Sequence, residues 1–216
     1  MIFTIDFHCH TAFSKDSLTS PGELVKTSHR RGLERVVVTD HNTIAGAKAA
    51  RLLDPELIIV GEEIKTTHGE ILAAYVTEEI PRGLPPGEVI KRLRNQGAFI
   101  SVSHPFDIRS GAWALEDLLE IAPLVDAIEI FNARCMKPGA NNMALLFAQD
   151  HNLPGTAGSD AHAAFELGAA CVELPQFNGP DELRNVIGQG KVRGRLSPFW
   201  VHIVSRYARL RKEVAV

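Results

Sequence analysis

The sequence predicts an α/β protein in which a parallel sheet, covered by helices on its outside, closes into a barrel. Two observations support this fold class. Short apolar segments alternate with amphipathic ones along all 216 residues, and such β–α alternation implies a parallel sheet. Seven or eight of these units in one domain favour a barrel over an open sheet. No G-x-G-x-x-G motif follows the first strand, so a dinucleotide-binding fold has no support.

The expected strands are rich in β-branched residues and nearly continuous in apolar character, which is typical of buried parallel strands. They are expected at residues 2–7, 35–39, 57–60, 71–76, 98–102, 127–131, 155–158 and 169–174.

Three helices have clear start signals. Ser20 is placed as an N-cap before Pro21 and Glu23, which predicts a helix that stops at Gly32. Similar signals predict helices from residue 86 to 97 and from residue 180 to 188 or 190.

The composition is that of one globular domain spanning residues 1–216, with 45% hydrophobic and 23% charged residues. No apolar run is long enough to cross a bilayer, and no secretory signal is expected. Three cysteines without CxxC spacing favour a reducing compartment, so a cytoplasmic location is expected. The net charge of −3 gives no general attraction to nucleic acid.

Ionisable residues gather where the expected strands end, and in a β/α barrel these carboxyl ends meet on the face that carries the active site. The strand-end segments are Asp6–His10, Asp40–His41, Glu62–Glu63, Ser103–His104, Asn132–Arg134 and Ser159–His162. Five of the nine histidines lie in them. A single such residue is often a cap or turn former, but six strand ends together indicate a functional site.

These side chains are suited to binding metal. Alternate residues of a strand point the same way, so Asp6, His8 and His10 are expected on one face. Histidine and carboxylate ligands without thiolates suit Zn²⁺, Mn²⁺ or Fe²⁺. Eight or nine candidate ligands exceed the needs of one ion, so two or three divalent ions bridged by a carboxylate are expected.

Taken together, the motifs resemble the PHP (polymerase and histidinol phosphatase) family along most of the chain. They are Asp6-x-His8-x-His10-Thr11, Ser14–Ser17 with Ser20-Pro21, Thr39–Thr43, Gly61–Ile64, Ser103–Pro105 and Ser159–His162. The resemblance implies a distorted (β/α)7 TIM-like barrel and a phosphoester substrate.

The resemblance also implies roles for individual residues. One metal would be held by His8, His10, Glu63 and Asp160, with Glu63 bridging to a second metal on His104. A third would be held by Asp16, His41 and His162. Glu63 is preferred to Glu62 because it directly precedes Ile64. Asp40 and Asp6 would support the ligands, and His162 or Asp160 would manage the proton during hydrolysis.

Two departures from the family pattern bear on these roles. Lys15 is inserted, and Ser17 replaces a glycine, near the expected ligand Asp16. Glu70 and Asn132 stand in regions where the family often has a histidine, so the second metal is expected to be either under-coordinated or completed by water. Arg134 and then Arg109 are the candidates for binding a substrate phosphate.

The chain ends in a basic helix expected at about residues 197–213. The last 26 residues hold seven lysines and arginines and one glutamate. Phe199, Ile203, Tyr207 and Leu210 form an apolar stripe. We expect that stripe to pack on the barrel with the basic face in solvent; the alternative is that the basic face guides a polyanion.

The sequence thus predicts a phosphoesterase for a small phosphate monoester, of the histidinol phosphate or nucleotide phosphate type, in which a metal-activated hydroxide attacks phosphorus. The alternatives are a nuclease or 3′,5′-nucleotide phosphatase that trims short oligonucleotides, a carbon–nitrogen or lactone hydrolase, and a non-catalytic metal-binding module. No membrane partner is expected, and the sequence leaves the oligomeric state open.

Overall fold

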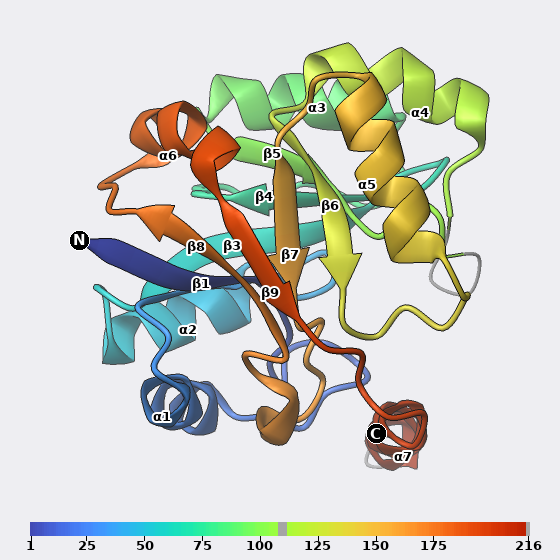
Figure 1. Cartoon of the computed structure of the whole chain (residues 1–216). Helices are drawn as coiled ribbons and strands as arrows, with labels where there is room; N and C mark the ends of the chain where they lie inside the picture. Colours follow the sequence, from blue (N-terminus) through green and yellow to red (C-terminus); the bar gives the residue numbers. More distant parts are fainter. Residues whose placement is uncertain (108–111, 215–216) are drawn as a thin grey trace.

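The computed structural model describes residues 1–107 and 112–214 (Figure 1). Arg109, a predicted substrate-binding residue, lies outside the described residues. The strands are β1 (Ile2–Cys9), β2 (Arg35–Val38), β3 (Ile58–Lys65), β4 (Glu70–Ala74), β5 (Phe99–Val102), β6 (Ala127–Asn132), β7 (Gly155–Gly158), β8 (Ala170–Pro175) and β9 (Lys191–Gly194). The helices are α1 (Pro21–Arg31), α2 (Ala45–Leu53), α3 (Pro86–Asn95), α4 (Leu115–Ile121), α5 (Ala140–Asp150), α6 (Pro180–Val186) and α7 (Val201–Val214).

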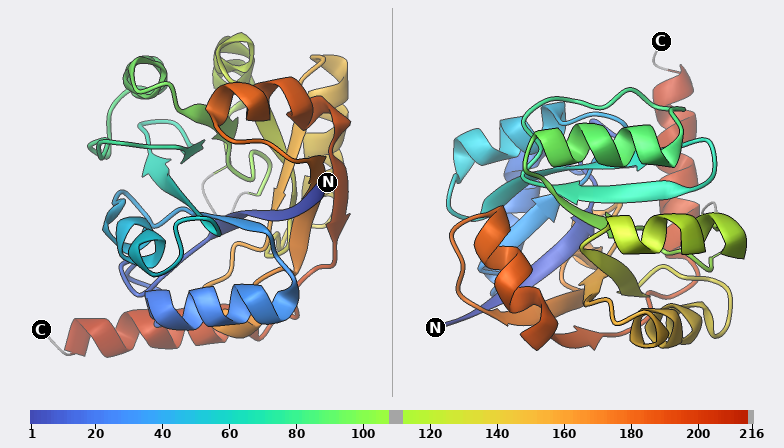
Figure 2. Two further views of the ribbon diagram at one scale, coloured as in Figure 1. Left: turned by 90° about the vertical axis from the view of Figure 1, so that its left-hand side faces the viewer. Right: turned by 90° about the horizontal axis from the view of Figure 1, so that it is seen from above.

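All nine strands form one sheet in the order β7-β6-β5-β4-β3-β2-β1-β8-β9. The sheet nearly closes because the segment after β7 returns to the end of β1. There Asp160 N donates to His8 O at 2.7 Å, and His10 N donates to Ala161 O at 2.9 Å. The predicted distorted barrel is therefore confirmed, with β1 to β7 as its wall and β8 and β9 as an extension beside β1 (Figures 1 and 2).

The sheet is not purely parallel, which corrects one expectation. Strand β4 runs antiparallel to both β3 and β5. Only four residues separate β3 from β4, too few for the crossover helix that a parallel pair needs. Thr66 closes this turn, because its N–H and its hydroxyl both donate to Gly69 O, at 2.9 and 2.7 Å. Strands β8 and β9 are also antiparallel, and β9 was not expected from the sequence.

The three helices with start signals are confirmed. Ser20 caps α1 by accepting a hydrogen bond from Glu23 N, and Gly32 ends the helix in the left-handed conformation that glycine tolerates. Helices α3 and α6 begin at Pro86 and Pro180, as proline at the first helical position favours. Among the described residues, no helix is both long and apolar enough to span a membrane.

The C-terminal helix differs from its prediction in both start and orientation. It begins at Val201 instead of residue 197, because Ser197 precedes Pro198 and a residue before proline disfavours helical geometry. The stripe predicted to pack on the barrel faces solvent instead, with Ile203 60% and Tyr207 56% exposed. The buried side chains of this helix are instead those of Val201 and Ala208.

Apolar side chains fill the barrel beneath the polar strand ends. Phe3, Ile5 and Phe7 of β1 belong to one buried cluster, in which Phe7 lies 6.3 Å from Phe99 between ring centroids. A second cluster lies between the sheet and the helices and includes Leu24 of α1. The rigid apolar interior supports the strand ends, where the buried polar residues concentrate.

Candidate metal centre

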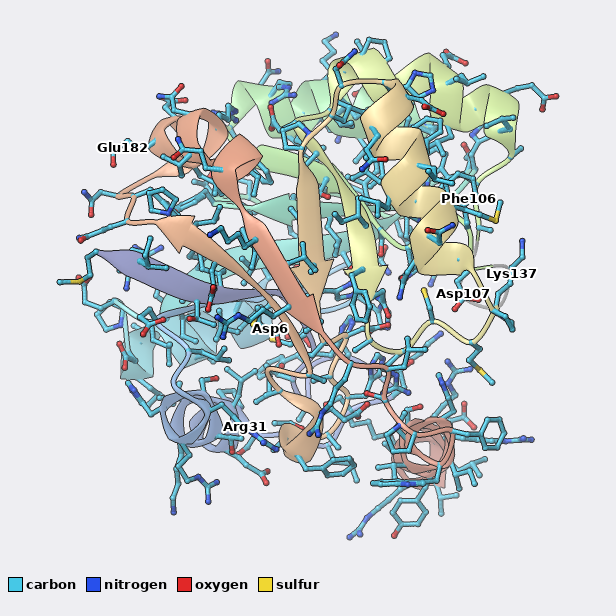
Figure 3. All side chains as sticks on the ribbon, in the orientation of Figure 1. Asp6, Arg31, Phe106, Asp107, Lys137 and Glu182 are labelled. Atoms are coloured by element: carbon cyan, nitrogen blue, oxygen red, sulfur yellow. The ribbon has the colours of Figure 1, made fainter. Side chains whose placement is uncertain are left out.

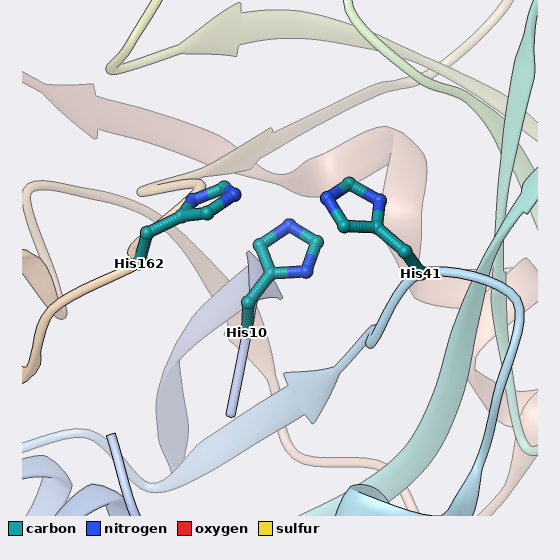
Figure 4. A group of neighbouring side chains, drawn as sticks. All are labelled: His10, His41 and His162. Carbon is teal, nitrogen blue, oxygen red and sulfur yellow. The ribbon is translucent and has the colours of Figure 1, made fainter. Parts of the chain in front are cut away.

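Five strands, with the loops that follow them, bring the predicted metal ligands to one place. His8 and His10 lie at the end of β1, His41 follows β2, and Glu63 lies within β3. His104 follows β5, and Asp160 and His162 follow β7. Figure 4 shows the rings of His10, His41 and His162 pointing toward one another from three different segments. All of these side chains except His41 are buried.

Their ligand atoms form three overlapping groups, and within each group the atoms lie within 4.8 Å of one another. The groups are His8–His10–Glu63, Glu63–Glu70–His104 and His10–His41–His162. Glu63 belongs to two groups and so does His10. This sharing is what a set of closely spaced cations bridged by a carboxylate requires.

The first group is held by short contacts between its ligand atoms. His8 Nε2 lies 3.1 Å from His10 Nε2 and 3.4 Å from Glu63 Oε1. Asp160 Oδ1 joins it, 3.1 Å from His10 Nε2 and 3.5 Å from His8 Nε2. The four residues assigned to one metal by resemblance therefore converge on a single point.

The second group includes a residue that the sequence argument did not assign as a ligand. His104 Nε2 lies 3.2 Å from Glu63 Oε1 and 3.8 Å from Glu70 Oε2. Glu70 is the first residue of β4, and the hairpin from β3 carries it to the same end of the barrel. A carboxylate thus stands at the second metal position, where under-coordination or a water ligand was expected.

Asp16, from the loop after β1, lies beside the third group. Its Oδ1 lies 3.4 Å from His41 Nε2 and 3.5 Å from His162 Nε2. Although buried, this oxygen accepts no well-aligned hydrogen bond, and neither does Glu63 Oε2, which lies 2.8 Å from His41 Nδ1. Buried carboxylate oxygens without a partner are costly, and a cation beside each would satisfy them. The donor set therefore fits two or three divalent ions.

Outer contacts fix the orientation of the rings. His8 Nδ1 lies 2.9 Å from Glu129 Oε1, and His162 Nδ1 donates to Asp160 O at 2.8 Å. In each ring this leaves Nε2 with its lone pair toward the centre, as metal ligation requires. Glu129 was not assigned as a supporting residue, although a carboxylate inside the apolar strand Ala127–Phe131 was the available signal.

The two predicted supporting aspartates act differently. Asp40 accepts hydrogen bonds from the Thr11 hydroxyl and the Ser14 hydroxyl, both at 2.6 Å. Asp6 (labelled in Figure 3) accepts from the backbone N–H groups of Ser159 at 2.9 Å and Gly168 at 3.0 Å. The pairing of β1 shifts register after Asp6, so Asp6 is not on the face of His8 and His10 as expected. Burial raises the pKa of Asp6 to about 6.

Of the two adjacent glutamates, Glu63 lies in the centre and Glu62 does not. Glu62 is also buried, but its Oε2 accepts a hydrogen bond from Ile80 N at 3.1 Å. Burial raises the pKa of Glu62 to about 8. Burial would also raise the pKa of Glu63, but His8 and His41 outweigh it and hold that pKa well below its usual range.

A cavity of about 570 Å³ opens over the centre, with the ligand carboxylates among its lining. Its lining also includes five basic side chains, Lys15, Lys65, Arg82, Arg134 and Arg209. Cationic groups around a metal cluster suit a substrate with several negative oxygens.

Arg134, the predicted phosphate ligand, lines this cavity but is largely engaged by the protein. Its Nη1 donates to both oxygens of Glu166 at 3.1 Å, and its Nη2 donates to Ser205 Oγ at 2.8 Å. Arg209 of α7 is more exposed and reaches Asp16 Oδ2 at 3.3 Å. Helix α7 therefore places basic side chains at the edge of the centre.

Comparison with known proteins identifies two matching family descriptions. Residues 6–80 match the PHP domain, and residues 138–192 match the PHP-associated description. Two uncharacterized proteins of Methanocaldococcus jannaschii are each 35% identical to the chain. The alignments cover 83% of this chain and 74% of one protein, and 65% of this chain and 88% of the other.

Three further proteins are similar in part or in fold. A 5′-3′ exoribonuclease of Haemophilus influenzae is 39% identical over 64 residues, which is 28% of this chain and 23% of that protein. A two-domain protein of Bacteroides vulgatus, described as containing a predicted PHP-like metal-dependent phosphoesterase, has a TM-score of 0.74 at 19% identity over 96% of this chain and 70% of that one. A lesion-specific endonuclease of Pyrococcus furiosus has a TM-score of 0.66 at 18% identity. That match covers 89% of this chain and 58% of the endonuclease. At these identities, the structures share the fold.

Proposed function

The chain belongs to the PHP domain family, and we propose that it is a metal-dependent phosphoesterase that hydrolyses a small phosphate monoester. One observation carries the proposal: three overlapping ligand groups share Glu63 and His10 at the floor of a cavity with basic side chains around it. When bound, clustered divalent ions activate a water molecule and stabilise the attacking and leaving oxygens of phosphoryl transfer.

The ligand residues also prepare the centre for this chemistry. Glu129 and the Asp160 carbonyl hold His8 and His162 in the tautomers whose Nε2 atoms face the centre. Burial, and then the neighbouring His10, keep the pKa of His162 well below its usual value. His162 is therefore neutral at physiological pH, so its Nε2 can bind a metal or accept a proton. Asp160 is the other candidate for proton transfer, because it also lines the cavity.

The basic side chains of the cavity support a phosphorylated substrate. Lys15, Lys65 and Arg82 approach from the first loop, β3 and the loop before α3, while Arg209 approaches from α7. A terminal phosphate could contact the metals and one or more of these cations at once. A cavity of about 570 Å³ is in the range of small-molecule sites, which favours a monoester over a long polymer.

A nuclease is the second candidate. It is favoured by the position of Arg209 and Lys212, which bring the basic helix to the loop after β1: the Lys212 ammonium donates to the carbonyl oxygens of Ala12 and Ser14 at 2.5 and 2.6 Å. The partial match to an exoribonuclease and the shared fold with an endonuclease also support it.

A substrate panel separates these functions. Phosphate release by the purified protein with Mn²⁺ is measured on histidinol phosphate, nucleoside monophosphates, 3′,5′-bisphosphates and short oligonucleotides, each with a chelator control. Chelator-sensitive release from monoesters alone supports the proposal, whereas shortening of oligonucleotides supports the nuclease. Bound metal with no turnover on any member contradicts both and favours a different hydrolysis or a non-catalytic metal-binding role.

A further inference from the structure

The outward face of α7 carries a regular apolar stripe, which we call the α7 stripe. It consists of Ile203, Tyr207, Leu210 and Val214, together with Trp200, which directly precedes the helix. Their separations alternate between three and four residues, the spacing by which two helices pack in a coiled coil. Each side chain is 51–87% exposed. Large apolar groups in an unbroken row on a surface indicate a contact site.

The α7 stripe cannot pack on its own barrel, because the opposite face of α7 already packs there. Ala208 is buried against the protein, and Ser205 accepts a hydrogen bond from Arg134. Arg209 and Lys212 reach the loop after β1. Figure 2 shows α7 lying along one side of the molecule, with its C-terminal end projecting beyond the rest. Its outer face is therefore accessible to a second molecule.

We propose that α7 pairs in antiparallel fashion with α7 of a second copy of this chain, so that the protein is a two-fold symmetric dimer. In this arrangement Tyr207 packs against Leu210 of the partner subunit, and Ile203 packs against Val214 of the partner subunit. The reciprocal contacts follow from the symmetry. Trp200, which contacts Phe165 at 5.2 Å between ring centroids, extends the surface at each end.

The charges beside the stripe select the antiparallel direction. Arg206 and Glu213 flank the α7 stripe on the same side, seven residues apart. Among the described residues, neither side chain forms an ion pair. Antiparallel pairing places Arg206 beside Glu213 of the partner subunit, twice per dimer. Parallel pairing would place Arg206 beside Arg211 of the partner subunit, a repulsive contact.

The available area is sufficient for a specific dimer. With side-chain areas of about 150–250 Å² for the large residues, the exposed fractions of the stripe and of Phe199 amount to roughly 600 Å² per copy. Two copies would bury about 1,200 Å², the lower end of the range for specific interfaces. Because the inner face of α7 borders the metal centre, the same pairing would also hold the basic residues of α7 in place.

Sedimentation equilibrium of the full chain over a wide concentration range tests the dimer. The expected mass is that of two chains, and the double variant Ile203→Glu/Leu210→Glu should have the mass of one with an unchanged circular dichroism spectrum. Leu52→Glu is the matched control, since Leu52 on α2 is 87% exposed outside the stripe, and it should remain a dimer. A wild type with the mass of one chain, or a dimer unaffected by the double variant, overturns the proposal.

Charge exchange tests the direction and does not depend on the folding of the double variant. Arg206→Glu should weaken dimerisation by roughly tenfold, because it places two carboxylates together. Adding Glu213→Arg should restore wild-type affinity, because the pair is then only reversed. If Arg206→Glu strengthens the dimer, Arg211 is its neighbour and the antiparallel arrangement is wrong. If neither variant alters dimerisation, α7 is not the interface.

Discussion

Asp40 accepts a hydrogen bond of 2.6 Å from the Ser14 hydroxyl, which itself lies 3.2 Å from His10 Nδ1. Since that hydroxyl donates to Asp40, the ring N–H of His10 donates to the hydroxyl. A buried aspartate thereby fixes the tautomer of a histidine through a serine, and leaves His10 Nε2 for the metal. The Asp40 carbonyl accepts a hydrogen bond from Glu63 N at 3.2 Å, but in the described part of the chain the Asp40 carboxylate bonds Thr11 and Ser14 and no ligand side chain. The effect of that carboxylate on His10 therefore passes through Ser14.

Replacing Ser14 with alanine should therefore weaken metal binding without removing a ligand. Loss of an outer contact typically costs about 10- to 100-fold in affinity, and we expect this range for Mn²⁺ measured by calorimetry. Ser17→Ala is the matched control, because the Ser17 hydroxyl is buried in the same loop but donates to the His10 carbonyl. Equal affinities for the two variants would show that the relay does not orient His10.

Glu63 and Asp16 should differ in how many ions they hold. Glu63 belongs to two of the three ligand groups, whereas Asp16 lies beside the third. Glu63→Gln should lower the number of bound ions by more than Asp16→Asn does, as counted by elemental analysis after dialysis. Turnover of any active substrate should fall about 10³-fold in Glu63→Gln, corresponding to about 4 kcal/mol of lost stabilisation. Equal stoichiometries would rule out a bridging role for Glu63.

The fold class was predictable because local signals agreed with it. The proline and glycine residues at the ends of α1 and α6 start or stop a helix in any context. The apolar strands are buried as their composition indicates. The direction of β4 was harder to predict, because its apolar sequence suits a parallel or an antiparallel strand. Only the short connection between β3 and β4 indicates the antiparallel direction. The orientation of α7 was not predictable from periodicity, because its long basic side chains bind specific carbonyl and carboxylate oxygens on the barrel.

For the centre, motifs at strand ends predicted which residues would meet, but not their outer contacts. The position of Glu70 depends on the hairpin that turns β4 back toward the ligands. That of Glu129 depends on the spacing between neighbouring strands. Neither can be read from one segment alone. Arg134 shows the reverse, since its strand-end position favoured substrate binding while a distant residue, Glu166, engages its guanidinium.

The two possible roles of Arg134 lead to different outcomes. Arg134→Met removes the ion pair with Glu166, and breaking a buried pair typically costs about 3–5 kcal/mol. It should also increase hydrogen exchange in α7, which loses the contact at Ser205. The double variant Arg134→Met/Glu166→Gln should recover part of the stability, because no buried carboxylate is left unpaired. If the single variant raises KM but leaves stability and exchange unchanged, Arg134 acts on substrate alone.

Gly158 allows β7 to lie against β1 at the centre. A Cβ at this position would lie 2.2 Å from His8 Cβ and 2.8 Å from His8 N, so the backbone of β1 would have to move. Gly158→Ala should destabilise the protein by about 1–3 kcal/mol or more and reduce metal affinity, measured by urea unfolding and calorimetry. Gly87→Ala in α3 is the control, because its Cβ meets nothing within 4 Å. Two variants of equal stability would contradict the close approach.

Glu62 should make stability depend on pH in a direction opposite to that of a paired carboxylate. Its folded-state pKa is raised by burial to about 8, from an ordinary value of 4.5. The folded protein therefore keeps this proton while the unfolded chain loses it, so stability falls as pH rises from the unfolded to the folded pKa. Between pH 6 and 9 the loss from this one group is on the order of 3 kcal/mol.

Glu62→Gln should remove that loss, because a neutral amide oxygen can still accept the hydrogen bond from Ile80 N. The variant should exceed the wild type in stability, with a larger margin at pH 9 than at pH 6, in urea unfolding with chelator present. Glu120→Gln is the control, since Glu120 is exposed and should leave the pH dependence unchanged. A margin that stays constant across this pH range would mean that Glu62 ionises normally, with water reaching its carboxylate.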